Sequence, residues 1–151
     1  MHVTARADYA VRAVVELAAT PAGSATRQQL AAAQDIPGKF LEGILTDLRR
    51  AGLLHAQRGS RGGYQLALSA SEIALADIIR AVEGPLAAVR GEPPEDTTYG
   101  GAATSLTAVW VALRASIRQV LETTTVADVV AGELPREVRE LLDHPAAWAR
   151  R

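Results

Sequence analysis

Four arginines are concentrated in one short stretch of this chain that contains no acidic residue. Arg49, Arg50, Arg58 and Arg61 lie between residues 48 and 71. Guanidinium groups bind phosphate oxygens through paired, charge-assisted hydrogen bonds. The stretch therefore indicates a surface that faces a polyanion. The alternative, an ordinary solvated face, is left open by the charge pattern alone.

No comparable grouping points to catalysis or to metal binding. The acidic residues Asp8, Glu16 and Glu83 have no nucleophile motif, phosphate-binding loop or metal-ligand set around them, so they are interpreted as helix-surface charges. The three histidines, His2, His55 and His144, form no closely spaced ligand pair and are predicted to be surface residues. The chain is therefore not expected to be an enzyme.

The composition limits the class of protein further. With 151 residues, 48% of them hydrophobic, the chain can bury the core of one domain, with or without a small accessory element. The absence of cysteine excludes disulfides, thiolate metal sites and thiol redox sensing. Charged residues within the first helical stretch argue against a signal peptide or a membrane span, so a cytoplasmic protein is expected.

Three predicted helices precede the loop of the arginine-rich stretch and would fix its position. Thr4 is predicted to be the N-cap of a helix over residues 5–20, and Thr26 with Gln29 predicts a capping box for a short helix over 27–33. A third helix follows residues 36–37, and its buried face is predicted to carry Leu41, Ile44, Leu45 and Leu48. Gly52 is expected to end this helix.

Two short alternating runs then flank a loop rich in glycine and arginine. The runs cover residues 53–57 and 64–68 and predict a β-hairpin. Three helices and such a hairpin occur in the order of a winged helix-turn-helix, whose third helix enters the major groove of DNA. The predicted fold class is thus mainly α with a small β-wing.

The second half of the chain is predicted to be helical around one long loop. A helix over 76–82 is followed by a loop over 91–101, a long helix over 105–122 and a short helix over 125–130. The apolar stripe of the long helix is too broad for one small domain to cover, which predicts a homodimer. This stripe comprises Leu106, Val109, Trp110, Leu113, Ile117, Val120 and Leu121.

The sequence resembles the Rrf-type family of bacterial winged helix-turn-helix transcription regulators. The resemblance rests on TARADYAVRA at 4–13, IPGKFLE at 36–42, LRRAGL at 48–53, RGSRGGYQLA at 58–67 and IIRAVEGP at 78–85. It implies a winged domain at 1–85, a sensor-like loop at 86–104, a dimerisation region at 105–131 and a tail at 132–151. The implied function is sequence-specific binding of double-stranded DNA, as a repressor or an activator, by a homodimer on a near-palindromic operator.

The resemblance also implies individual DNA contacts. Lys39, Phe40 and Glu42 would face the major groove, and Arg58 would enter or flank the minor groove. Contacts to phosphates would come from Thr4, Tyr9, Thr26 and Arg27. The complete set of expected DNA-binding residues is Thr4, Tyr9, Thr26, Arg27, Gln28, Lys39, Phe40, Glu42, Arg49, Arg50, Arg58, Ser60, Arg61 and Tyr64.

Two features depart from the family pattern. Gly43 stands in the recognition helix where a longer polar residue is expected, and glycine can reach no base. Cluster-binding members place three cysteines in the loop before the long helix, where this chain has residues near Gly91, Thr98 and Thr104. Iron–sulfur clusters are held chiefly by cysteine thiolates. No cofactor is therefore expected, and the effector is not identified by the sequence.

A second function is compatible with the same fold. Winged helices also serve as protein-interaction modules, which regulate a partner protein or are regulated by it. The acid-free arginine stretch argues against this alternative, because it indicates a polyanionic partner.

Overall fold

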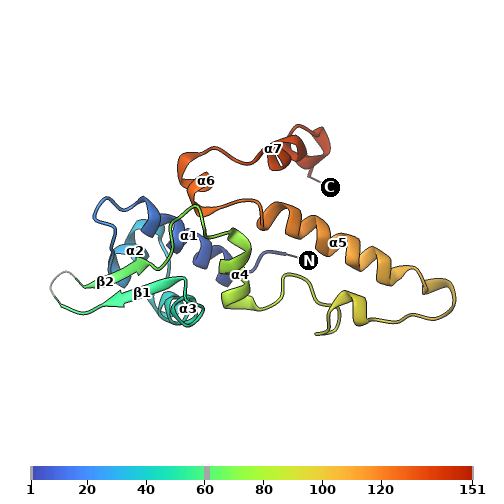
Figure 1. Ribbon diagram of the computed structural model, residues 1–151, viewed down its shortest axis with the longest axis horizontal. Helices are drawn as coiled ribbons and strands as arrows, with labels where there is room; N and C mark the ends of the chain where they lie inside the picture. The colour runs from blue at the N-terminus through green and yellow to red at the C-terminus, as the bar shows by residue number, and fades with distance from the viewer. Residues whose placement is uncertain (1, 60–61, 151) are drawn as a thin grey trace.

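The computed structural model describes residues 2–59 and 62–150. These residues form seven α-helices, one two-stranded sheet and three 3₁₀ turns (Figure 1). The helices and strands are α1 (Ala5–Ala19), α2 (Arg27–Gln34), α3 (Gly38–Arg50), β1 (Leu54–Gln57), β2 (Gly63–Leu66), α4 (Leu75–Glu83), α5 (Leu106–Leu121), α6 (Val126–Ala131) and α7 (Arg136–Leu142). The 3₁₀ turns cover Pro94–Asp96, Gly101–Ala103 and Pro145–Ala147. The predicted fold class, mainly α with a small β-wing, is confirmed.

Capping residues mark the starts of α1 and α2 and the end of α3. The Thr4 hydroxyl accepts a hydrogen bond from the backbone N–H of Ala7, and Thr26 forms a reciprocal capping box with Gln29. Gly52, with φ of 77°, follows the end of α3 in the left-handed conformation that glycine adopts without strain. The predicted helix starts and the predicted C′ glycine are confirmed.

The core of the winged domain is built from the inward faces of these helices. Leu41, Ile44, Leu45 and Leu48 of α3 are fully buried against α1, as their spacing predicted. The same cluster includes Val14 of α1, together with apolar residues of α2, β1 and α4. The outer face of α3 is thereby left toward solvent.

The wing is a short antiparallel hairpin. Leu54 pairs with Leu66 and Gln57 with Gly63. The hairpin is tied to the segment before α2, because Tyr64 and Ala25 exchange two backbone hydrogen bonds of 2.8 and 3.1 Å. The start of β2 thus lies directly against the entry to the helix-turn-helix.

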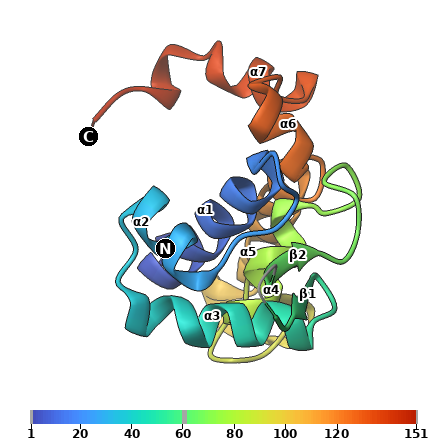
Figure 2. The same cartoon turned by 90° about the vertical axis from the view of Figure 1, so that its left-hand side faces the viewer.

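After α4, residues 84–104 lead away from the winged domain alongside α5, and α5 runs back toward it (Figure 1). α6 then packs against α1 of the winged domain. The N–H of Val126 donates to the carbonyl of Ile73, and the N–H of Leu75 to that of Thr124. Figure 2 shows α3 and α6 on opposite sides of α1. Val126 is fully buried in the winged-domain core, a placement that the sequence did not indicate.

α7 is an element that the sequence did not predict, because prolines interrupt this part of the chain. It is seven residues long, follows Pro135 and buries only Val138. None of the helices in the described part of the chain has the length and apolar content needed to cross a bilayer.

Candidate nucleic-acid interface

The exposed face of α3 is the centre of the candidate interface. Lys39, Thr46 and Arg50 lie opposite the buried leucines and are exposed, with Gly43 between them. Helical spacing puts Glu42 and Arg49 along one edge of this face, and Phe40 and Asp47 along the other. A helix that buries one side completely and presents a polar opposite side can be inserted into a groove of DNA.

Glu42 forms an ion pair with the first residue of α2. The carboxylate accepts a hydrogen bond of 2.7 Å from Nη1 of Arg27, and both side chains remain largely exposed. The two residues were each expected to touch DNA, one at a base and one at a phosphate. The structure brings the two side chains together. Any contact of Glu42 with a base would therefore be made by a carboxylate that Arg27 holds in place.

Phe40 lies beside Tyr9 of α1 at the other edge of the face. The ring centroids are 6.3 Å apart, and the Arg12 guanidinium lies 5.6 Å from the Tyr9 centroid. Phe40 nevertheless keeps 55% of its surface exposed. A large apolar side chain with this exposure is available for contact with DNA, such as a thymine methyl group.

The predicted phosphate contacts at helix starts have structural roles as well. The Thr4 hydroxyl caps α1 and donates a hydrogen bond of 2.6 Å to Glu83 at the end of α4. Thr26 caps α2, and Gln28 is exposed in its first turn. Backbone N–H groups at such helix starts bind anions readily, since the helix dipole is positive there.

A hollow beside the wing is lined by two arginines. Its volume is about 470 Å³, and it lies between the end of α3 and β1. Arg49 and Arg58 line it together with Gly52, Leu54, His55 and Ala56, so no carboxylate competes for the two guanidinium groups within the lining. This is the geometry expected of a phosphate-binding surface.

Of the remaining wing residues predicted to contact DNA, only Tyr64 lies in the part of the chain that the structure describes. Tyr64 is half-buried and packs against the core of the winged domain. Ser60 and Arg61, also predicted to contact DNA, lie outside the described residues.

Arg6 is a residue of this region that the sequence analysis missed. Its guanidinium pairs with Asp47 of α3, and its Nε donates a hydrogen bond of 3.2 Å to the carbonyl of Val82 in α4. A Cβ at Gly43 would lie 3.8 Å from Nη1 of Arg6. Arg6 thus joins three helices behind the recognition face, a contact between residues far apart in the chain that local patterning cannot reveal.

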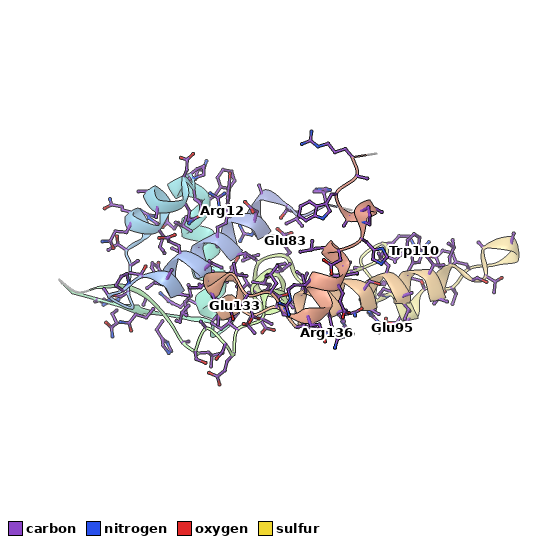
Figure 3. The ribbon with its side chains drawn as sticks, turned by 90° about the horizontal axis from the view of Figure 1, so that it is seen from above. Arg12, Glu83, Glu95, Trp110, Glu133 and Arg136 are labelled. Carbon is purple, nitrogen blue, oxygen red and sulfur yellow. The ribbon has the colours of Figure 1, made fainter. Side chains whose placement is uncertain are left out.

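Residues 86–104 are attached to α5 by side-chain contacts. Nε1 of Trp110 donates a hydrogen bond of 3.0 Å to the Tyr99 hydroxyl, and Arg114 pairs with Glu95. Figure 3 shows Trp110 and Glu95 along α5, away from Arg12 of α1. The Glu95 pKa is lowered, first by a hydrogen bond from its own backbone N–H and then by Arg114.

The side chains of this segment do not fit an iron–sulfur cluster. The full sequence contains no cysteine, and the positions expected to correspond to the cluster ligands, near Gly91, Thr98 and Thr104, offer no thiolate. Among residues 2–59 and 62–150, no group of three or more His, Cys, Asp or Glu side chains is placed to hold a metal ion.

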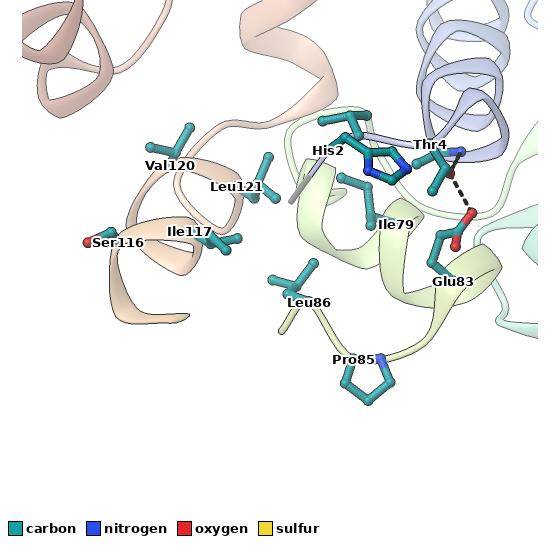
Figure 4. A pocket seen from close by; sticks show the side chains of 12 residues that line it. His2, Thr4, Ile79, Glu83, Pro85, Leu86, Ser116, Ile117, Val120 and Leu121 are labelled. Carbon is teal, nitrogen blue, oxygen red and sulfur yellow. Dashed lines mark hydrogen bonds between the residues drawn. The ribbon is translucent and has the colours of Figure 1, made fainter. Parts of the chain in front are cut away.

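α5 has an apolar face that its own chain covers only in part. None of its sixteen residues is fully buried, and Val109 is 52% exposed. An adjoining hollow of about 650 Å³ opens between the start of α1, α4 and the C-terminal half of α5 (Figure 4). Ile117, Val120 and Leu121, all expected at a dimer interface, line this hollow.

Comparison with known proteins identifies relatives over most of the chain. The model of the Rrf2 family, described as an iron-dependent transcriptional regulator, matches residues 3–132. Rv1287 of Mycobacterium tuberculosis, a protein named for the helix-turn-helix class of transcriptional regulators, is 51% identical over 95% of this chain and 89% of its own length. IscR of Cereibacter sphaeroides, also named as such a regulator, is 34% identical over 89% of this chain and 90% of its own.

Solved structures show the same similarity. CymR of Bacillus subtilis, titled as the global cysteine regulator, superposes with a TM-score of 0.74 and 26% identity, over 87% of this chain and 98% of its own. IscR of T. potens gives a TM-score of 0.68 and 28% identity, over all of this chain and 93% of its own.

Proposed function

This chain belongs to the Rrf2 family of transcriptional regulators, and we propose that it represses transcription as a homodimer bound to a near-palindromic operator. As a family member it is a DNA-binding regulator and not an enzyme. Three parts of this proposal go beyond the family assignment: the homodimer, the near-palindromic operator and repression.

The observation that carries the proposal is the cationic surface formed by α3 and the wing. Arg49 and Arg58 share a hollow with no acidic lining residue, and Lys39 and Arg50 are exposed on the adjoining face of α3. The arginines supply phosphate affinity, whereas the side chains of α3 supply base recognition. A protein-interaction module would have no need for this distribution of charge.

The homodimer is supported by the incompletely covered apolar face of α5. A monomer would leave this face and the adjoining hollow lined by Ile117, Val120 and Leu121 in contact with water. A second copy of the chain would bury both. A two-fold dimer presents two recognition helices related by symmetry, which favours an inverted repeat as the operator. We propose that such a dimer represses by covering promoter DNA.

Regulation by this protein is proposed to be independent of an iron–sulfur cluster. This proposal is supported by the absence of any thiolate that could hold a cluster in residues 86–104. Purified protein is expected to be colourless. A visible absorbance band that is accompanied by bound iron would contradict this part of the proposal.

Two measurements test the proposed function. Sedimentation should give a particle of twice the 15.9 kDa chain mass, and Val109→Asp should yield a monomer. Leu141→Asp, at an exposed position of α7, is the matched control and should leave the dimer intact. Binding to duplex DNA should weaken steeply as salt is raised. A monomeric parent protein would refute the dimer, and salt-insensitive or absent DNA binding would favour the protein-interaction alternative.

A further inference from the structure

A second hollow lies outside the DNA-binding surface, between α4, residues 84–95 and α5. Its volume is about 510 Å³, which is sufficient for a small molecule. Small apolar residues form part of its wall, among them Pro85, Leu86, Ala87 and Pro93. Charged side chains of both signs line the rest.

Two of its three arginines are already paired with carboxylates. Arg114 pairs with Glu95, and Arg80 pairs with Glu122. The third, Arg118, makes only a long ion contact, with its Nε 3.7 Å from Oε1 of Glu122. Within residues 2–59 and 62–150, no hydrogen bond from its guanidinium is found. Arg118 therefore retains donors that can bind a ligand.

Glu92 is the corresponding acidic residue on the loop side of the hollow. It follows a tight turn at Arg90 and Gly91, both with positive φ, and its backbone pairs with Val89. Over the described part of the chain, the Glu92 carboxylate has neither an ion pair nor a hydrogen bond. The hollow thus presents one uncommitted guanidinium and one uncommitted carboxylate.

The two unpaired groups, one positive and one negative, determine which charges a ligand can carry. A simple anion would share the hollow with the unpaired carboxylate of Glu92, and a simple cation would share it with the unpaired guanidinium of Arg118. A molecule that carries both charges meets neither penalty. We propose that the hollow binds a small zwitterion of the α-amino-acid class, with its carboxylate at Arg118, its ammonium at Glu92 and its side chain against the apolar wall.

The position of the hollow connects such a ligand with the recognition helix. Its α4 wall includes Arg80 and Gly84, and between them the Val82 carbonyl accepts the hydrogen bond from Arg6, which pairs with Asp47 of α3. If a ligand binds more tightly when the last turn of α4 is in one of two positions, it favours that position. The contacts of Arg6 would then carry the change from α4 to the orientation of α3. This regulatory consequence rests on the proposed function, whereas ligand binding itself does not.

Isothermal titration calorimetry of the full-length protein without DNA tests the proposal. The twenty standard L-amino acids are titrated at up to about 10 mM, and the tightest binder is compared with its carboxamide and its des-amino acid. At least one amino acid should bind, and both analogues should bind at least about tenfold more weakly, because each lacks one of the two charged groups.

Substitutions of the two proposed ligand-binding residues test the same proposal. Arg118→Gln and Glu92→Gln are at exposed positions and should each weaken binding about tenfold or more. Arg139→Gln, at an exposed position of α7, is the control and should bind as the parent does.

Three results would overturn the proposal: no amino acid binds, the des-amino acid binds as tightly as the amino acid, or neither site variant weakens binding. Because no DNA is present, failure of the proposed DNA binding would leave these results unaffected.

Discussion

Arg58 and Glu42 carry opposite charges on the DNA-facing side of the molecule and are expected to act differently. Arg58 lines the cationic hollow beside the wing, whereas Glu42 is held by Arg27 at the edge of the recognition helix. The resemblance to the family implied that both contact DNA. The sequence could not predict the Arg27–Glu42 pair, because the two residues come close only when α2 packs against α3.

Arg58→Ala should weaken DNA binding, chiefly at sites with a narrow, A·T-rich minor groove next to the half-site. The loss of one cation should lower the slope of log affinity against log salt by about one unit per phosphate contact. Fluorescence anisotropy at several salt concentrations measures both effects. Arg139→Ala, on the exposed surface of α7, is the control. An unchanged slope would show that Arg58 contacts no phosphate.

Glu42→Ala should relax base preference and leave the salt slope nearly unchanged. A carboxylate in the major groove accepts a hydrogen bond from cytosine N4, and its removal should cost about 1–3 kcal/mol of discrimination at one position per half-site. Competition between operator variants measures this discrimination. If Glu42→Ala discriminates between operator variants as well as the parent protein does, Glu42 serves only to hold Arg27.

Among the elements, the wing depends on its glycines, and Gly63 is the one that lies against the segment before α2. Gly63 has φ of 148°, and a Cβ there would lie 2.7 Å from the carbonyl oxygen of Ala25. The sequence predicted the hairpin from its glycines and alternating residues. The close approach to residue 25 could not be predicted, because it depends on how the hairpin packs against the segment before α2.

Gly63→Ala should therefore lower the free energy of unfolding by about 2 kcal/mol or more, through backbone strain and the clash with Ala25. Urea denaturation followed by circular dichroism measures the change. Gly38→Ala is the matched control: its Cβ would meet no atom within 4 Å, and it should be neutral or slightly stabilising. Equal stability of the two variants would contradict the packing of β2 described above.

The segment at 86–104 should loosen from α5 in acid. The folded pKa of Glu95 is lowered below its ordinary value of 4.5, first by its own backbone N–H and then by Arg114. A lowered carboxyl pKa stabilises the folded state above the ordinary value, and that stabilisation is lost as the pH falls through the folded pKa. At neutral pH the contribution of Glu95 should thus be fully present.

Trp110 fluorescence can follow this transition in a Trp148→Phe background, since these are the two tryptophans of the chain. The emission should change as the pH falls below 4.5. Glu95→Gln should show the loosened signal already at neutral pH and no further change over that interval. An acid transition that persists unaltered in Glu95→Gln would assign it to other carboxyl groups.

At the scale of the whole molecule, local patterning predicted more of the elements than of their arrangement. Capping residues, helical stripes and the glycine-rich loop predicted α1 to α6 and the wing. The return of Val126 into the winged-domain core was not predicted, because it requires contacts with residues 70–75, far earlier in the chain. α7 was missed because the prolines at 135 and 145 mask its pattern. The hollow beside α4 was missed as well, since charged residues from three separate segments line it.

Selection of bound duplexes from a random DNA pool at two salt concentrations tests whether two symmetry-related copies of α3 and the wing recognise a specific sequence. We expect enrichment of one inverted repeat, with the same sequence at both salt concentrations and weaker binding at the higher one. Its half-sites should be about one helical turn of DNA apart or a multiple of it. Absence of an enriched sequence, or enrichment of a single unrepeated site, would contradict this expectation.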